Sequence, residues 1–385
     1  MNAPQKDSPS DSLMPSLLSG KRRPLNLLAG DVVEVRSADE IIETLDDHNT
    51  FDSLPFMPEM LPYCGRRFRV YKRAHKTCDV IGPHSVRRMK NAVFLEDLRC
   101  DGQAHGGCQA ACLTFWKEAW LKKVPRREAE DFTPDSPGTR DQAALRVLTD
   151  ESLQRASTKL LKTTQVETEA SPPEEIRYSC QATEMQKASS YMAWWDPRQY
   201  WQDWRSGNVG ILQMIRALLI SLFNTIQHHR RGGKYPFIEG KLTKTPQVIL
   251  NVQPGDLVRL KPKDEILKTL DLRNRNRGLS FDRELVKFCG GTYRVLRRVE
   301  HEINNVTGKM MNFRSDCIVL KGVLCHGDYN QFCQRSIYHY VRETWLERVA
   351  DPDRVGGTVP ACAHVPCADN RNAPAIRATP NLSDK

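Results

Sequence analysis

Motifs that identify common enzyme classes are missing from this sequence. It contains no phosphate-binding loop, no dinucleotide-binding glycine fingerprint, no H-E-x-x-H zinc motif and no G-x-S-x-G nucleophile elbow. Hydrophobic residues make up only 39% of the 385 residues, which excludes a multi-span membrane protein, and the composition also excludes collagen and a coiled-coil rod. No catalytic residue can therefore be assigned by motif, and one compact domain of this length is not expected.

The first 28 residues contain no apolar core of signal-peptide length. We therefore expect a cytoplasmic protein whose twelve cysteines stay reduced, and serve as metal ligands, buried thiols or reactive thiols. Lys and Arg exceed Asp and Glu by 57 to 47, giving a net charge of +10, but the basic residues are scattered along the chain. This pattern predicts a solvated basic surface, and a nucleic-acid partner is not expected.

The strongest feature of the sequence is an internal repeat. Residues 30–124 align with residues 255–349 at a constant offset of 225 without a gap, and 27 of these 95 positions are identical. Composition alone would give roughly 6 identities. The identities cluster, as in GDVVEV against GDLVRL and CGRRFRVYKR against CGGTYRVLRR. The chain therefore contains two copies of one module.

Each copy is predicted to be a small, mainly β module of the α+β class. Gly-Asp followed by alternating valines at 30–35 indicates a turn into a half-buried strand, and residues 68–71 and 92–95 indicate two more strands. Several short strands around glycine turns favour a small Src-homology-3-like barrel, with the second copy built in the same way. This similarity of strand pattern implies no function.

A helix is predicted to close each barrel, over residues 109–124 and 334–349. It carries Trp120 in the first copy and Trp345 in the second, and we expect both indole rings to be core anchors.

The rest of the chain is divided by composition. We predict disordered tails, a charged linker with one helix at 141–162, and a Trp-rich helical connector between the two barrels. The predicted boundaries are 1–29 (N-terminal tail), 30–124 (first barrel), 125–177 (linker), 178–254 (connector), 255–349 (second barrel) and 350–385 (C-terminal tail).

Residues 209–226 form the most apolar stretch of the connector. They carry one charge, Arg216, and follow the segment AWWDPRQYWQDW at 193–204. A central Arg disfavours a membrane span. We expect a helix buried between the two barrels, and the alternative is a helix lying at a membrane interface, which would make the protein peripheral to the membrane.

Three cysteines recur at equivalent positions of the two copies, as Cys64/Cys289, Cys100/Cys325 and Cys108/Cys333. In the first copy the glycine-rich loop after Cys100, and the one-turn spacing of Cys108 and Cys112, can bring ligands together. The sequence therefore predicts a tetrahedral zinc site in this copy, with an iron–sulfur cluster as the alternative. Its predicted ligands are Cys100, His105, Cys108 and Cys112.

The second copy lacks a counterpart of Cys112, because Ile337 occupies that position. A metal site there would use another ligand set, namely Cys317, Cys325, His326 and Cys333. The alternatives for these thiols are buried apolar residues or redox-active groups.

The segments CDGQAHGGCQAACLTFWKEAWLKKV, GDYNQFCQRSIYHYVRETWLERV and WWDPRQYWQDWRSGNVG together resemble a group of uncharacterised bacterial proteins. The resemblance covers most of residues 30–349 and implies a duplicated, Cys-rich, GDxV-opening module. It also implies an association with genes for glycan or natural-product biosynthesis, and it supplies no catalytic residue.

The leading hypothesis is an accessory or scaffold protein with two metal-stabilised modules and a protein partner. His75, His84 and His105 of the first copy have no histidine at the equivalent positions of the second, and a scaffold tolerates such changes better than an active site does. The alternative is a metal- or thiol-dependent enzyme with one working centre at 100–112. A basic-barrel nucleic-acid binder is the third hypothesis.

Overall fold

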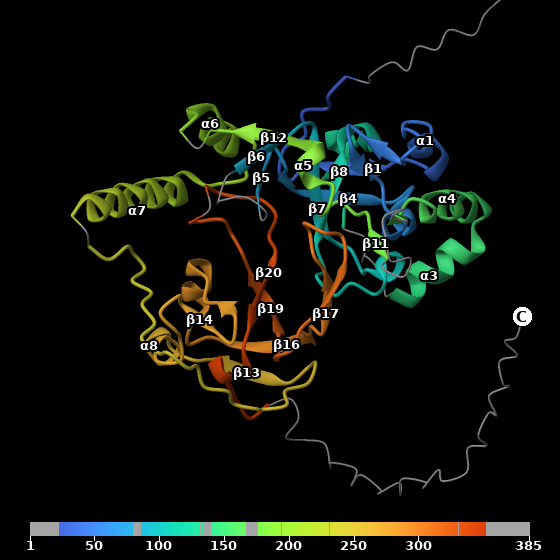
Figure 1. Cartoon of the computed structure of the whole chain (residues 1–385). Coiled ribbons are helices and arrows are strands. Elements are labelled where there is room, and N and C mark those ends of the chain that lie inside the picture. The colour runs from blue at the N-terminus through green and yellow to red at the C-terminus, as the bar shows by residue number, and fades with distance from the viewer. Residues whose placement is uncertain are drawn as a thin grey trace, which may run out of the picture. The chain divides into compact units, whose positions relative to one another are not determined.

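The computed structural model describes residues 23–79, 86–130, 132–133, 140–166, 176–193, 195–230, 232–329 and 331–351. Two five-stranded antiparallel sheets, one in each repeat, form the framework (Figure 1). Their strand orders are β8-β7-β4-β1-β9 and β20-β19-β16-β13-β21. The first sheet consists of β1 (Val32–Val35), β4 (Arg67–Arg73), β7 (Ala92–Arg99), β8 (Leu113–Lys117) and β9 (Leu121–Lys123). The second consists of β13 (Leu257–Leu260), β16 (Thr292–Arg298), β19 (Ile318–Leu324), β20 (Tyr338–Val341) and β21 (Leu346–Arg348).

The two sheets agree in register as well as in order. Val32 pairs with Arg69 in the first sheet, and Leu257 pairs with Arg294, at the same offset of 225, in the second. A register shift also recurs, after Val70 in the first copy and after Val295 in the second. Such bulges bend a strand and increase its twist, which suits two curled sheets. The same fold of the two copies, predicted from their gapless alignment, is thus confirmed.

Short elements connect the strands in the same order in each copy. They are α1 (Ala38–Ile42), β2 (Thr50–Phe51), β3 (Leu54–Pro55) and the 3₁₀ helix η1 (Pro58–Tyr63) in the first copy. Their counterparts are α8 (Lys263–Leu267), β14 (Arg275–Asn276), β15 (Leu279–Ser280) and η4 (Arg283–Phe288). Helix α1 begins with a capping box, in which Ser37 and Glu40 satisfy each other's backbone amides.

The prediction that a Trp-bearing helix closes each barrel is wrong. Residues 113–123 form β8, the 3₁₀ turn η3 (Glu118–Trp120) and β9, and the second copy has β20, η5 (Glu343–Trp345) and β21. All five residues of β8 are buried, so this strand is covered on both faces. Thr114 and Lys117 interrupt the apolar residues of this strand without a regular alternation, so its sequence does not show the period of two that identifies a half-exposed strand.

Each sheet has its own apolar core. Trp120 and Trp345 are both fully buried, which confirms their predicted role as core anchors. Their rings make the same edge contact in each copy, with Phe56 at 5.1 Å and with Phe281 at 5.4 Å between ring centroids.

The linker holds more structure than was predicted. Helix α2 (Arg126–Ala129) is followed by α3 (Arg140–Thr149) and α4 (Glu151–Leu161), where one helix was expected over 141–162. Asp150 divides the two because its carboxylate accepts the backbone N–H groups of Ser152 and Leu153, as an N-cap does. Leu153 and its neighbours on α4 then pack onto the first core. A two-stranded ribbon, β10 (Gln165–Val166) and β11 (Arg177–Tyr178), follows.

The predicted connector adds elements to the first copy. It contains α5 (Met185–Ala188), β12 (Ser189–Met192), α6 (Pro197–Arg205) and α7 (Ile211–His229). Strand β12 joins β6 (Val86–Met89) and β5 (Lys76–Cys78) in a three-stranded sheet. In the second copy β17 (His301–Ile303) and β18 (Met310–Asn312) form a separate ribbon.

The prediction that residues 209–226 form a buried helix is also wrong. They contribute most of α7, in which no residue is buried. Within the described residues, no helix is long and apolar enough to cross a membrane.

Candidate functional site

Two of the predicted metal ligands come together in the first copy. Ligand atoms of Cys100, His105 and Glu59 lie within 4.8 Å of one another, and this is the one such group among the described residues. Cys108 and Cys112 do not belong to the group, although both line a cavity of about 40 Å³ together with Cys100, His105 and Cys180. A zinc ion held by the four predicted ligands therefore stays a prediction.

The three-residue group is organised around a buried ion pair. His105 Nδ1 lies 2.6 Å from Glu59 Oε1, and its Nε2 lies 3.1 Å from the carbonyl oxygen of Ser179. Burial alone lowers the pKa of His105, but the hydrogen bond and charge of Glu59 outweigh it and raise the pKa. Burial and the charge of Glu59 raise the pKa of Cys100, which keeps the thiol protonated. Glu59 and His105 therefore form a structural ion pair, and Cys100 beside them is a protonated thiol and not a thiolate ready to bind a metal.

The predicted ligands of the second copy are dispersed. Cys317 packs in a small apolar cluster with Val299 and Val319, and the ring of His326 contacts that of Phe288. The sulfur of Cys333 accepts a hydrogen bond from the backbone N–H of Cys78, in the first copy. Burial raises the pKa of Cys325 far above its usual range. Among the described residues of this copy, no three ligand atoms approach as those of the first copy do.

Glu59 was overlooked in the sequence, although it aligns with Glu284 in the second copy. Each glutamate accepts a backbone N–H from the loop after the recurring cysteine, that of Ala104 at 3.1 Å and that of Tyr329 at 2.6 Å. Ala104 and Tyr329 are themselves equivalent positions, so the two copies brace this loop in the same way. The shared bracing needs no metal, and it explains why the glutamate recurs while His105 does not.

We expect the Glu284→Gln substitution to stabilise the protein at pH 8. Burial raises the pKa of Glu284 to about 7 from an unfolded value near 4.5, so the folded state binds the extra proton. The contribution of Glu284 to the free energy of unfolding is then fully present below pH 4.5. It is lost as the pH rises through 7, and the loss is on the order of 2–3 kcal/mol. Glutamine mimics the protonated acid and can still accept the Tyr329 N–H.

Urea denaturation at pH 5 and pH 8 measures this effect. The difference in unfolding free energy between the two pH values should shrink in Glu284→Gln, whereas the exposed Glu265→Gln should keep the wild-type difference. Identical pH profiles for the wild type and Glu284→Gln would show that Glu284 is ionised in the folded protein.

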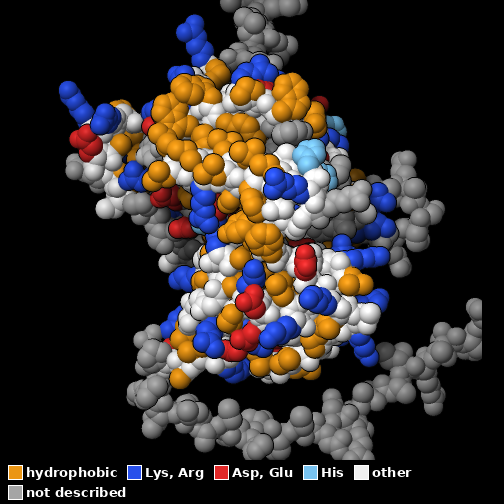
Figure 2. All heavy atoms as spheres, turned by 90° about the vertical axis from the view of Figure 1, so that its left-hand side faces the viewer, with side chains coloured by type: hydrophobic (Ala, Val, Ile, Leu, Met, Phe, Trp, Pro, Cys, Tyr) orange, Lys and Arg blue, Asp and Glu red, His pale blue; other side chains and the backbone are white. Residues whose placement is uncertain are grey.

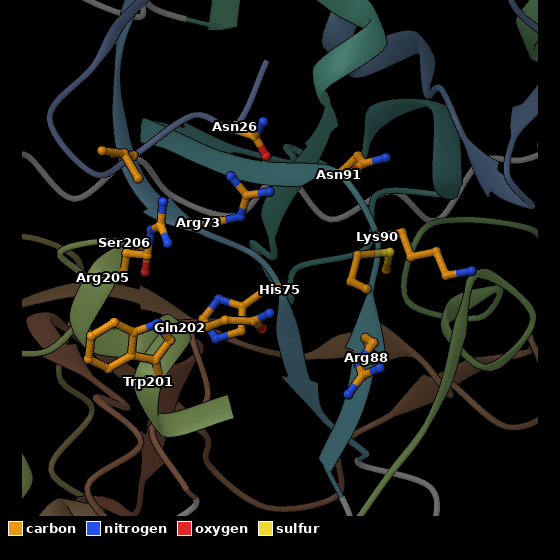
Figure 3. A pocket seen from close by; sticks show the side chains of 12 residues that line it. Asn26, Arg73, His75, Arg88, Lys90, Asn91, Trp201, Gln202, Arg205 and Ser206 are labelled. Carbon is orange, nitrogen blue, oxygen red and sulfur yellow. The ribbon is translucent and has the colours of Figure 1, made fainter. Parts of the chain in front are cut away.

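A second candidate site is a pocket of about 670 Å³, which we call the cationic pocket. It lies between the edge of the first copy and α6, and Figure 3 shows basic side chains around it on several sides. None of the described residues that line it is acidic. Its lining residues are Asn26, Leu28, Arg73, His75, Arg88, Met89, Lys90, Asn91, Trp201, Gln202, Arg205 and Ser206.

Two of its cations are paired with acidic residues, and the other two have no such partner among the described residues. Arg73 lies 3.3 Å from the buried carboxylate of Glu118, and Arg88 lies 3.4 Å from Asp196. In contrast, the side chains of Lys90 and Arg205 form no hydrogen bond or ion pair within the described part of the chain. The pocket therefore has positive charge available for an anion.

The second copy keeps only one of these cations, because Arg73 recurs as Arg298 whereas Phe313 occupies the position of Arg88. At the positions equivalent to His75 and Asn91 it carries the acids Glu300 and Asp316, and Ser315 replaces Lys90. The positive charge is thus a feature of the first copy and of α6, which has no counterpart in the repeat.

A buried polar network fixes α6 behind the pocket. Asp203 and Lys76 are both fully buried, with Nζ 2.5 Å from Oδ2, and Asp203 Oδ1 accepts the side-chain N–H of Gln334 at 2.8 Å. The pocket residue His75 lies 3.1 Å from the same Asp203. This network holds α6 in place, and α6 contributes Trp201 and Arg205 to the pocket.

Sequence reasoning missed this pocket for a definite reason. Its cations come from β4, from β6 and the turn after it, and from the distant helix α6, so in the sequence they look like scattered surface charge. The one local signal was the Trp-rich segment that precedes Arg205. Comparison of the chain with known protein families, curated proteins and solved structures found no match.

Proposed function

We propose that the protein is an accessory protein that binds a nucleoside phosphate, or a similar phosphorylated small molecule, in the cationic pocket. The observation that carries the proposal is the pair Lys90 and Arg205, whose cations have no acidic partner among the described residues, in a pocket to which those residues contribute no acid. A volume of about 670 Å³ lies within the usual range for small-molecule sites.

The other lining groups suit the remainder of such a ligand. The ring of Trp201 is 57% exposed at the pocket and offers a face on which a base can stack. The amides of Asn26, Asn91 and Gln202 supply both donors and acceptors for the polar edge of a base or a sugar. We assign a binding role and no reaction step, which agrees with the accessory function expected from the sequence.

Calorimetric titration with AMP, UMP and inorganic pyrophosphate tests the proposal. The double variant Lys90→Gln/Arg205→Gln should weaken binding by roughly 100-fold or more, because each of the two hydrogen bonds between charged partners contributes about 1.5–3 kcal/mol. The matched control is Lys244→Gln/Arg273→Gln, which removes two exposed positive charges elsewhere and should bind as the wild type does.

The outcomes separate the alternatives. Equal loss in both double variants would mean that only net charge matters, and absence of binding at millimolar nucleotide would refute the proposal. Binding of single-stranded oligonucleotides without binding of mononucleotides would favour the nucleic-acid hypothesis instead.

Metal stabilisation of the two modules remains a separate proposal. It is supported by the approach of Glu59, Cys100 and His105, which together can supply three ligands. The engagement of both His105 nitrogens with protein partners weighs against it.

A further inference from the structure

Helix α7 presents apolar side chains to solvent along its whole length. Leu212, Leu219 and Leu222 are 84%, 61% and 58% exposed, and further exposed apolar side chains continue the same surface. These others are Ile211, Ile215, Leu218, Phe223 and Ile226. Figure 2 shows hydrophobic side chains gathered on the face of the molecule where α6 and α7 lie. A monomeric soluble protein rarely leaves so large an apolar patch uncovered.

The rotation of α7 about its axis is fixed by polar contacts. Gln213 donates to Asp328 at 2.6 Å, and Asn224 donates to the carbonyl oxygen of Tyr235 and accepts its N–H at 2.7 Å. The half-buried side of the helix mixes polar Gln213 and Asn224 with apolar Met214, Ala217 and Ile220, whereas its leucines are turned outward. Because of this orientation, the exposed leucines are available to contact a partner outside the described chain.

Aromatic residues extend this surface beyond α7. Trp195, Trp201 and Trp204, in and before α6, are 69%, 57% and 42% exposed. The rings of Trp201 and Trp204 lie against each other at 4.8 Å between centroids. Tryptophan is the residue type enriched where proteins meet the boundary between lipid headgroups and hydrocarbon.

The charges of α7 favour an anionic lipid surface as the partner. The helix contains no Asp or Glu, whereas Arg216 lies among its leucines and His228, His229 and Arg230 follow at its end. A second copy of α7 would bring Arg216 and Arg230 toward cations of their own kind without an acid on the helix to match them. Lipid phosphates neutralise these cations while the acyl chains cover the leucines.

We propose that α7 is a membrane-surface helix, which lies in the plane of an anionic bilayer with Leu212, Leu219 and Leu222 inserted between the lipids. The proposal does not depend on ligand binding in the cationic pocket. In this arrangement the two repeats are held at the membrane surface, without a membrane-spanning segment.

Sedimentation with vesicles tests the proposal. The full-length protein should pellet with phosphatidylcholine vesicles containing 30% phosphatidylglycerol, about tenfold less with pure phosphatidylcholine, and less at 0.5 M than at 0.1 M salt. The variant Leu219→Gln/Leu222→Gln should lose at least tenfold in partitioning. Leu145→Gln/Leu148→Gln is the matched control, because it removes two leucines of similar exposure from α3 and should pellet as the wild type does.

Two further measurements keep the result unambiguous. Circular dichroism and AMP titration establish whether the α7 variant is folded and retains its pocket, and light scattering gives the oligomeric state without lipid. Absence of pelleting with anionic vesicles would overturn the proposal. So would a lipid-free dimer that the α7 variant converts to a monomer, which would identify a second copy as the partner.

Discussion

Replacing Asp203 by Asn is expected to lower the free energy of unfolding by about 3–5 kcal/mol, because it leaves a buried ammonium group without its counter-ion. The side chains of Asp203 and Lys76 are both fully buried, so the ammonium group is removed from bulk solvent. Asn keeps the size of the side chain and can still accept the Gln334 N–H. The loss should therefore report the missing charge and not a change of shape.

The pH dependence of the variant distinguishes this explanation from a packing defect. Burial lowers the pKa of Lys76, and the charge of Asp203 opposes this effect. Without Asp203 the folded-state pKa falls further, so the folded variant binds fewer protons than the unfolded chain. Its stability should then rise between pH 7 and pH 10, as the unfolded lysine also loses its proton.

Denaturant unfolding followed by tryptophan fluorescence measures the effect. The exposed pair Arg259–Glu347 provides the control, since Glu347→Gln should change the stability by less than about 1 kcal/mol. A loss below about 1 kcal/mol in Asp203→Asn would contradict the prediction and indicate that Lys76 is neutral in the wild type. Because α6 supplies Trp201 and Arg205, we also expect weaker nucleotide binding in this variant.

The repeat made the framework predictable from the sequence. A strand pattern that recurs at the same offset is evidence for a strand in both copies. The patterns at 32–35 and 257–260 each strengthen the strand prediction for the other segment. The predicted Trp anchors are buried for the same reason, since a large apolar residue that recurs at one position of a module belongs to its core. In the first copy the closing segment was mispredicted because its strand β8 is buried on both faces and carries no period of two.

The sites were less predictable because they depend on contacts between distant segments. The burial of α7 was expected from its composition alone, whereas its orientation is set by Gln213 and Asn224, whose partners lie outside the helix. Cys100, Cys108 and Cys112 line one cavity, whereas their convergence on one metal ion stays a prediction. Cys180, which lies outside the repeat, also lines it, and no sequence pattern linked this residue to the others.

Gly102→Ala should destabilise the first copy more than any other glycine substitution of equal backbone strain. Gly102 has a φ of +75°, and a β-carbon there would overlap the backbone carbonyl of Cys108. The equivalent Gly327 has a φ of +77° and the same conflict with the backbone of Cys333. The close approach of the two chain segments thus recurs with the cysteines, and it holds the loop that Glu59 and Glu284 brace.

The control for Gly102→Ala is Gly30→Ala. Gly30 has a φ of +90° but nothing within 4 Å of the position of a β-carbon, so its substitution adds only conformational strain, about 1–2 kcal/mol. Gly102→Ala adds the overlap to a similar strain, and we expect a loss of at least about 3 kcal/mol. The displaced loop should also make Cys100 and Cys108 react faster with a thiol reagent in the native state. Equal losses in the two variants, with unchanged thiol reactivity, would mean that the loop can move aside and that its close contact with Cys108 does not stabilise the module.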